Sequence, residues 1–373
     1  MTLFLAVFFL IYGLMHAYFI AKVRAAFPGI QPYTILVVPL LVLAPLIIRV
    51  LERNGFDLIA WVLSWIGYSW MAVLLLFLTI SLAFDAWRAV AAGIHLLTGH
   101  TFASISPQKA FVVPLLAAVC LFAYGLHEAV DIRTERILLK SPKIPRDSTP
   151  IKIVQISDVH LGLIIREERL DRILERIRRE NPDLVISTGD LLDGQTDNLK
   201  NAALLLREIR PKLGKIAVLG NHEYYSGFDH ACDFHRRAGF VLLRGEDKQL
   251  SGFLHVIGLD DPAAKSFGLY RRLPPERATG DSSADRFVLL LRHRPVVDEE
   301  CRVFDLQLSG HTHGGQIFPF SIVTRIFFHN MDRGLHLLSR DVWLYVNRGS
   351  GTWGPPIRFL TPPEVTVIEI SHG

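Results

Sequence analysis

Residue types that bind metal ions gather in five short segments of the chain. Each segment begins where an apolar run ends, and each supplies Asp, Asn or His. The five segments are residues 158–160, 189–193, 220–223, 292–294 and 310–316. Carboxylate, imidazole and amide groups together suit borderline divalent ions such as Mn, Fe or Zn, whereas calcium prefers oxygen ligands alone. These ligands are too many for one ion, and two ions held close together can generate hydroxide and clamp a phosphoryl group.

The apolar runs that precede the five segments are typical of buried strands. We expect these strands over residues 151–157, 184–188, 216–219, 287–291 and 306–309. Apolar spacing predicts helices over residues 166–180, 199–210 and 228–238, and further strands over 254–259, 343–346 and 365–370. This order indicates a layered α/β domain with a strand-rich second half. Such sheets bind ligands at the carboxyl ends of their strands, which is where the five segments fall.

The five segments resemble the motifs of the calcineurin-like metallophosphoesterases. The sequences Gly-Asn-His-Glu at 220–223 and Gly-His-Thr-His-Gly-Gly-Gln at 310–316 are the most characteristic. Together with a membrane-anchored layout, they look most like the bacterial branch that acts on phospholipid-type or pyrophosphate substrates. The resemblance covers about residues 151–370, and it implies a four-layer α-β-β-α sandwich.

The resemblance also implies a role for each site residue. The first metal would be held by Asp158, His160 and His313, the second by Asn221, His293 and His311, and Asp190 would bridge the two. His222 would face the phosphate and stabilise or protonate the leaving oxygen, and Asp193 would orient His222. A metal-bridging hydroxide would attack phosphorus in line, so that no protein nucleophile is needed.

Two positions depart from the patterns of the family. The phosphoprotein phosphatase branch has Arg directly after the orienting Asp, whereas Gly194 stands here, which argues against a phosphoprotein substrate. Arg292 stands before His293, where a small residue is usual. Arg292 and Arg294 either bind a second phosphate or an anionic headgroup, or they are solvated surface residues. Of the two, Arg294 is the candidate for a substrate contact.

The front third of the chain differs in composition from the rest. The 373 residues are 50% apolar and 20% charged, which excludes an intrinsically disordered chain, and only ten charged residues lie in the first 130. Apolar runs occur over residues 2–20, 33–48, 58–84 and 111–130, of which three are long enough to cross a bilayer core. The second run is shorter, and it reaches that length if it extends through Val50 and Leu51 with Arg49 at the interface. We therefore expect a transmembrane anchor of four helices over residues 1–130, a charged linker over 131–150 and a metallophosphoesterase domain over 151–373.

The net charge and the cysteine content limit the possible partners and the possible cellular compartment. The net charge of +4 leaves the part after the anchor close to balanced, so no nucleic acid is expected as a partner. Three cysteines cannot make a disulfide framework, which fits a reducing compartment. With four crossings, seven Lys and Arg residues on the side of the two ends face four on the other side. This excess predicts an integral protein of a bacterial inner membrane with its catalytic domain in the cytoplasm.

Three functions remain open at this point. The first is hydrolysis of a lipid phosphodiester or a lipid-linked pyrophosphate at the bilayer. The second is the same chemistry on a soluble nucleotide or another phosphoester. The third is a membrane sensor without turnover, against which the complete ligand set argues. The apolar stretch over residues 317–328 either forms a buried strand or makes a lipid-facing rim beside the site.

Overall fold

The computed structural model describes residues 2–194, 200–274, 285–297 and 303–373. The chain divides into two compact units. The helical unit comprises residues 1–127 with 354–357, and the α/β unit comprises residues 128–353 with 358–373.

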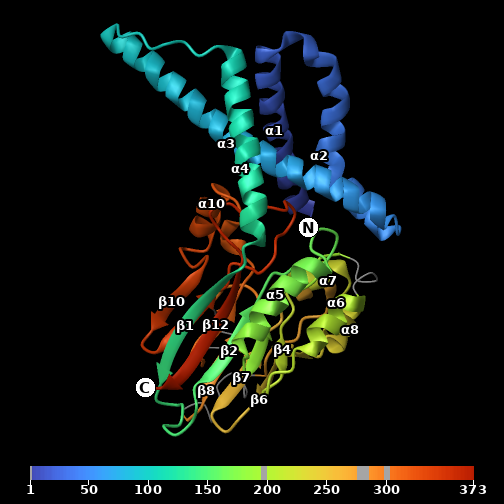
Figure 1. The fold of residues 1–373 in the computed structure, drawn as a ribbon, viewed down its shortest axis with the longest axis vertical. Helices are drawn as coiled ribbons and strands as arrows, with labels where there is room; N and C mark the ends of the chain where they lie inside the picture. The colour runs from blue at the N-terminus through green and yellow to red at the C-terminus, as the bar shows by residue number, and fades with distance from the viewer. Residues whose placement is uncertain (1, 195–199, 275–284, 298–302) are drawn as a thin grey trace. The chain divides into compact units, whose positions relative to one another are not determined.

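The helical unit contains four long helices (Figure 1). They are α1 (Thr2–Ala26), α2 (Gln31–Arg53), α3 (Asp57–Thr98) and α4 (Pro107–Val130), with a short 3₁₀ turn, η1 (Pro28–Ile30), between the first two. Within the described residues, α1, α3 and α4 are long and apolar enough to cross a membrane. Three of the four expected crossings are thus supported, and a crossing by α2 stays a prediction. Helix α3 also continues past the expected end at residue 84, and its 42 residues correspond to about 63 Å of helix.

The α/β unit is built on two six-stranded mixed sheets (Figure 1). The first sheet has the order β1 (Arg133–Ser141), β12 (Glu364–His372), β2 (Ile151–Ile156), β3 (Leu184–Ser187), β4 (Lys215–Ala217) and β5 (Val241–Leu242). The second has the order β10 (Gly334–Ser339), β11 (Val342–Val346), β9 (Leu306–Ser309), β8 (Phe287–Leu291), β7 (Leu254–Gly258) and β6 (Glu246–Gln249). Strands β2 to β5 run parallel, as do β7, β8, β9 and β11, so each sheet gathers several strand ends at one edge.

The two sheets face each other across a shared apolar core. Alternate residues of β2 and β3, such as Ile153 and Ile186, pack against residues of β8 and β9, such as Leu289 and Leu308. The other face of the first sheet is covered by α5 (Glu167–Glu180), α6 (Lys200–Glu208) and α8 (Phe228–Arg237). These three helices are amphipathic, and they bury one apolar stripe each against the sheet.

The outer face of the second sheet completes the layered fold. Within the described residues it is covered by loop side chains, among them Leu273 and Phe304, rather than by a long helix. The expected layers are therefore present, and the fourth is thin. Outside residues 317–328, the helices and strands expected from the sequence in this unit form within two residues of their expected ends.

The expected linker over residues 131–150 is wrong for its first half. Residues 133–141 form β1, which pairs in parallel with β12 over nine residues. Ile137, Leu139 and Ser141 of β1 are buried, whereas Leu138 and Lys140 between them are exposed, as is Arg136 before them. An edge strand with one solvated face needs few apolar residues, so its sequence can be as charged as that of a linker.

The expectation of a buried strand over residues 317–328 is also wrong. This stretch forms helix α10 (Phe320–Phe327), and most of its large apolar side chains are exposed. Only the alternative of an exposed apolar rim agrees with this arrangement.

The buried side chain of His235 on α8 makes the stability of the α/β unit depend on pH. Its Nδ1–H donates to the carbonyl of Ala231 (2.8 Å), and its buried Nε2 has no hydrogen-bond partner within the described chain. Burial lowers the pKa of His235 to about 4. In the unfolded chain this histidine binds a proton near pH 6.5, whereas in the folded chain it stays neutral until about pH 4. The free energy of unfolding therefore falls by about 3 kcal/mol as pH drops from about 6.5 to about 4.

The His235→Leu variant removes this proton-binding difference. The test is a urea titration of the full-length protein in detergent, with hydrogen exchange of β2–β4 peptides as the readout. Between pH 7 and pH 4, the free energy of unfolding of the variant should fall by about 3 kcal/mol less than that of the wild type. Parallel pH curves for the two proteins would contradict the prediction.

Candidate metal centre

The predicted ligands sit in loops at the carboxyl ends of strands from both sheets. Asp158 and His160 follow β2, Asp190 follows β3, and Asn221 starts the short helix α7 (Asn221–Ser226) after β4. His293 follows β8 in the other sheet, and residues 311 and 313 follow β9. The edge where the two sheets meet thus collects all seven predicted ligands.

Five of these residues have a left-handed backbone, which side-chain-bearing residues seldom adopt. The φ angles are 50° for Asp158, 56° for His160, 51° for Asp190, 71° for His311 and 51° for His313. Left-handed backbone in residues other than glycine costs free energy, and such strain concentrates at functional sites. The surrounding sheets hold these turns in place, which fixes the directions of the side chains.

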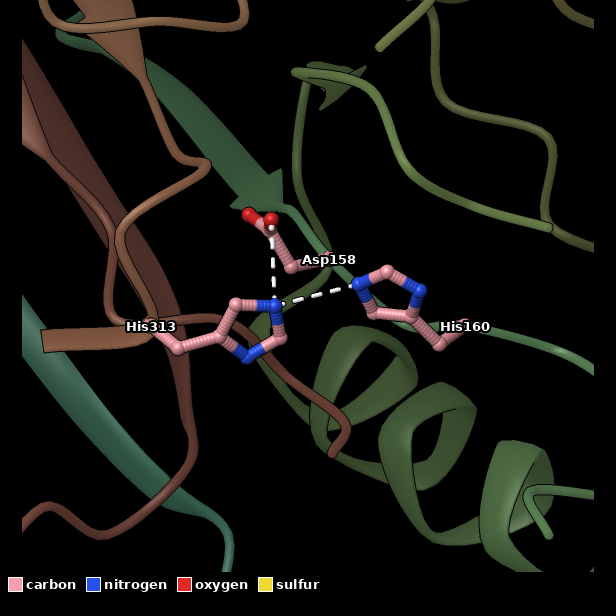
Figure 2. A group of neighbouring side chains, drawn as sticks. All are labelled: Asp158, His160 and His313. Carbon is pink, nitrogen blue, oxygen red and sulfur yellow. Dashed lines mark hydrogen bonds and ion pairs between the residues drawn. The ribbon is translucent and has the colours of Figure 1, made fainter. Parts of the chain in front are cut away.

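Asp158, His160 and His313 form the first cluster of possible ligands (Figure 2). The Nε2 atom of His313 lies 3.0 Å from Nε2 of His160 and 3.5 Å from Oδ1 of Asp158. All three residues are buried. Three donor atoms that point at one another in a buried space are the arrangement that a bound cation requires.

The carboxylate of Asp158 is held by its neighbours on both oxygens. The Ser157 hydroxyl donates to Oδ2 (2.5 Å), and the backbone N–H of His311 reaches both carboxylate oxygens at 3.0 Å. Gly310 makes this approach possible, because a Cβ there would lie 2.2 Å from Oδ2 of Asp158 and 1.9 Å from the Ser157 hydroxyl. The glycine before His311 is therefore a packing requirement of the site.

Asp190, His293 and His311 form the second cluster. Nε2 of His293 lies 3.1 Å from Oδ2 of Asp190 and 3.1 Å from Nδ1 of His311. The other ring nitrogen of His293, Nδ1, lies 2.8 Å from the carbonyl of Thr188 and must donate to it. That bond orients the ring and leaves Nε2 to face the other two side chains.

Asp190 lies between the two clusters. The same Oδ2 atom that contacts His293 is 3.8 Å from Nε2 of His160 in the first cluster. Its other oxygen, Oδ1, accepts the backbone N–H of His222 (2.8 Å). A carboxylate in this position can contact ions on both sides of it.

Asn221 adds an amide oxygen with an unfilled bonding requirement. The residue is buried, and within the described chain Oδ1 has no hydrogen-bond partner. A buried acceptor left in this state costs about 1–3 kcal/mol. The amide oxygen, the carboxylates and the imidazoles form a donor set that fits divalent metal ions, and the orphaned Oδ1 is accounted for if Asn221 is a ligand.

Burial sets the protonation states of most of the histidines. It lowers the pKa of His160 to about 4, and it holds the pKa values of His311 and His313 well below their usual range. These rings are therefore neutral near pH 7, which is the form that binds a metal. For His293, burial lowers the pKa, but the Asp190 carboxylate outweighs it and raises the pKa to about 10.

His222 and Asp193 form a pair that meets the first cluster at His160, and these three residues make a third group of possible metal ligands. Nδ1 of His222 lies 2.9 Å from Oδ1 of Asp193, and the rings of His222 and His160 meet edge to face at 4.7 Å. Burial lowers the pKa of His222, but Asp190 and Asp193 outweigh it and raise the pKa to about 9. The structure thus brings together the two residues that the sequence assigned to leaving-group protonation.

The reading of Arg292 and Arg294 as two solvated residues is wrong. Arg292 is buried, and its Nη1 donates to the carbonyl of Val296 (3.2 Å). Arg294 donates from Nε and Nη2 to the fully buried carboxylate of Asp261, at 2.7 and 3.3 Å. A substrate contact by Arg294 stays a prediction, and the Asp261 pair holds the guanidinium in place.

Glu223 is a structural residue that joins two loops of the site, and its sequence motif did not predict this role. Its carboxylate accepts backbone N–H bonds from Asp190 (3.0 Å), Leu192 (3.1 Å) and Gly220 (2.8 Å). It thereby ties the loop of the Asp190 carboxylate to the loop of Asn221. The one sequence feature that points to Glu223 is its place in the Gly-Asn-His-Glu motif. An acidic residue at that place could equally serve as a helix cap.

Arg358 holds the loop of the last metal segment, a role that no sequence motif predicts. It is fully buried and donates to the carbonyls of His313 (2.9 Å), Arg348 (2.8 Å) and Gly351 (2.6 Å). Its Nη2 also lies 3.2 Å from Nδ1 of His313. Arg358 stands in a loop 45 residues after His313, so spacing along the chain cannot reveal the contact.

Comparisons with known proteins agree with this geometry. Residues 151–315 match the family model described as calcineurin-like phosphoesterase. An uncharacterized metallophosphoesterase of Aquifex aeolicus is 41% identical over 260 residues, which cover 69% of this chain and 98% of that protein. The uncharacterized metallophosphoesterase YkuE of Bacillus subtilis is 34% identical, with 68% and 93% covered. A transmembrane protein with metallophosphoesterase domain from Danio rerio is 29% identical, with 70% and 63% covered.

Proposed function

The chain belongs to the calcineurin-like phosphoesterases, and on this premise we propose that it hydrolyses a phosphodiester or pyrophosphate of a membrane lipid. It is a metal-dependent phosphoric ester hydrolase, and its apolar helices together with its transmembrane relatives indicate membrane association. The observation that supports a two-metal site best is the position of Asp190, whose Oδ2 atom lies within 4 Å of nitrogen atoms in both clusters.

The proposed centre holds two divalent ions, which are Mn, Fe or Zn. Asp158, His160 and His313 would hold one ion, Asn221, His293 and His311 would hold the other, and Asp190 would bridge them. Ions held there would activate water and neutralise charge on the phosphoryl oxygens. The chain itself contributes ligands that are already oriented by Ser157, Thr188, Glu223 and Arg358.

His222 is the proposed general acid. Its Nδ1–H donates to Asp193, so a second proton would sit on Nε2. With a pKa near 9 the ring holds both protons at neutral pH, and Nε2–H can be transferred to the leaving oxygen of the ester. Asp193 orients the ring and favours its charged form.

The charges that flank the last apolar helix support a cytoplasmic position of the α/β unit. Lys109 lies near the start of α4, whereas Arg133, Arg136, Lys140 and Lys143 follow its end. Positive residues near the ends of spanning helices favour the cytoplasmic side. We therefore place the α/β unit in the cytoplasm, at a bacterial inner membrane, where it meets lipid substrates confined to the bilayer.

A substrate comparison with the full-length protein tests this function. The purified protein in detergent with manganese is given an aryl phosphodiester, a dispersed lipid extract and a set of soluble nucleotides. Release of phosphate or of a headgroup from the extract, at a higher kcat/KM than from any nucleotide, is expected. A clear preference for nucleotides would remove the lipid hypothesis, and no turnover of any substrate would favour a sensor.

A further inference from the structure

Helix α10 carries its apolar side chains on the outside. Phe320, Ile322, Val323, Ile326 and Phe327, here called the α10 face, are between 40% and 75% exposed. The buried residue of this helix is Thr324, so the usual pattern of apolar inside and polar outside is reversed. Five such side chains expose on the order of 500 Å² of apolar surface, which is at the upper limit for a water-facing monomer surface.

The helix is packed directly onto the last metal segment. Gly315, at the end of the 3₁₀ turn η3 (His313–Gly315), touches the start of α10 so closely that a Cβ would lie 2.2 Å from Cα of Ser321. At the other end, the ring of Phe328 meets the ring of His311 edge to face at 6.0 Å. Whatever binds the α10 face therefore lies next to the ligands of the proposed centre.

The charge around the α10 face is positive. Residues 317–331 contain no Asp or Glu, and Arg325 projects from the helix as an exposed cation. Its Nε donates to Oδ1 of Asn330 (3.0 Å), which holds the guanidinium beside the apolar residues. Apolar side chains bordered by arginine fit the boundary between acyl chains and anionic headgroups.

Chain connectivity keeps the α/β unit close to the bilayer. Only Asp131 and Ile132 separate the end of α4 from β1, which spans about 10 Å at most when extended. The last residues of α4 belong to the α/β unit: Glu128 accepts the N–H of Leu360 (2.8 Å), and the carbonyl of Ala129 accepts from Nη1 of Arg169 (2.5 Å). A lipid surface is therefore the large apolar partner within reach of this unit.

We propose that the α10 face inserts into the surface of the bilayer and holds the metal centre at the level of the lipid headgroups. This contact is separate from the transmembrane anchor, and it gives the protein a second, interfacial attachment. The insertion itself does not require a lipid substrate. Its consequence, that a lipid phosphate meets the centre without leaving the membrane, rests on the proposed function.

Depth measurements on the full-length protein test the insertion. The three cysteines, Cys120, Cys232 and Cys301, are changed to alanine, and Ile326→Cys introduces one site for a nitroxide label. The protein is placed in nanodiscs that contain anionic phospholipid. Collision rates are then measured with oxygen, which concentrates in acyl chains, and with a water-soluble nickel chelate. The control is Leu204→Cys on α6, a residue that is 57% exposed in the same structure.

Each result of the depth measurement has one meaning. Insertion predicts a severalfold higher ratio of oxygen to nickel collisions at position 326 than at position 204. Equal ratios would overturn the proposal. Low collision rates with both reagents would place the α10 face against protein, and dipolar broadening between labels would identify a second copy of the chain as that protein. Either of these outcomes would also overturn it.

Activity measurements test the consequence separately. The double variant Ile326→Ser/Phe327→Ser should lose about tenfold or more of its turnover of lipid in nanodiscs, while turnover of a water-soluble aryl phosphodiester changes by less than about twofold. The matched control Leu204→Ser should change neither. Equal losses on both substrates would show a packing role only. If the wild type ignores lipid but cleaves the aryl diester, the lipid function fails while the depth data still decide the insertion.

Discussion

The Asp190→Ala variant is expected to lose phosphodiester turnover almost completely, with kcat/KM lowered by about a thousandfold or more. A carboxylate that serves two ions contributes several kcal/mol to stabilising the charge of the transition state, and each 1.4 kcal/mol is a factor of ten. The distances of 3.1 Å to His293 and 3.8 Å to His160 give Asp190 this position. The measurement is steady-state hydrolysis of an aryl phosphodiester by the full-length protein with manganese.

Metal analysis separates loss of an ion from loss of the fold. We expect about two ions per wild-type chain and at most one per Asp190→Ala chain after gel filtration. Asp171→Ala, on the exposed side of α5, is the matched control and should keep both activity and metal. If wild type and Asp190→Ala hydrolyse the ester equally, the proposed centre is not the active site.

The His222→Gln variant should lower kcat by about 10²–10⁴-fold for esters with poor leaving groups, because the general acid is removed. The loss should be much smaller for a nitrophenyl ester, whose leaving oxygen needs no proton. His230→Gln, an exposed histidine close by in sequence, serves as the control and should leave both rates unchanged. A loss that is the same for all leaving groups would argue against proton transfer by His222.

A pH profile tests the pairing of His222 with Asp193. The Asp193 carboxylate is one of three carboxylates, with Asp190 and Glu223, that raise the pKa of His222 to about 9, and the protonated ring is the active form. Activity therefore falls as pH rises through that pKa, and in Asp193→Asn the fall should begin at a lower pH. An unchanged alkaline limb would show that Asp193 does not act through His222.

Most of the site could be predicted from the sequence because each ligand follows a buried strand. The strand 184–187 is fully buried and begins with three apolar residues, and Asp190 follows its end by three residues, where the chain must turn at the end of the strand. The left-handed turns could not be predicted, because Asp and His carry no general requirement for that conformation. The left-handed turns are seen only in the structure, where the two sheets hold the loops in place.

The incorrect predictions concern segments whose local sequence pattern does not match their burial or contacts in the folded chain. Strand β1 looks like a charged linker, because its outward face is solvated and the charged residues Arg136 and Lys140 stand on either side of the buried Ile137 and Leu139. Helix α10 is as apolar as a core strand, yet it lies on the surface. Arg358 acts through backbone carbonyls far away in sequence, and no spacing rule covers that.

The pairing of β1 with β12 also delays completion of the first sheet during biosynthesis. Strand β1 is the first of the α/β unit to leave the ribosome, but its partner in the sheet is β12, and Arg133 must wait for Glu364. Until then, the backbone N–H and C=O groups of β1 face solvent beside the membrane, and an open strand edge invites misassociation. The first sheet can therefore be completed only after residue 364 has been synthesised, and nascent chains that stall before it should depend on chaperones that shield β1.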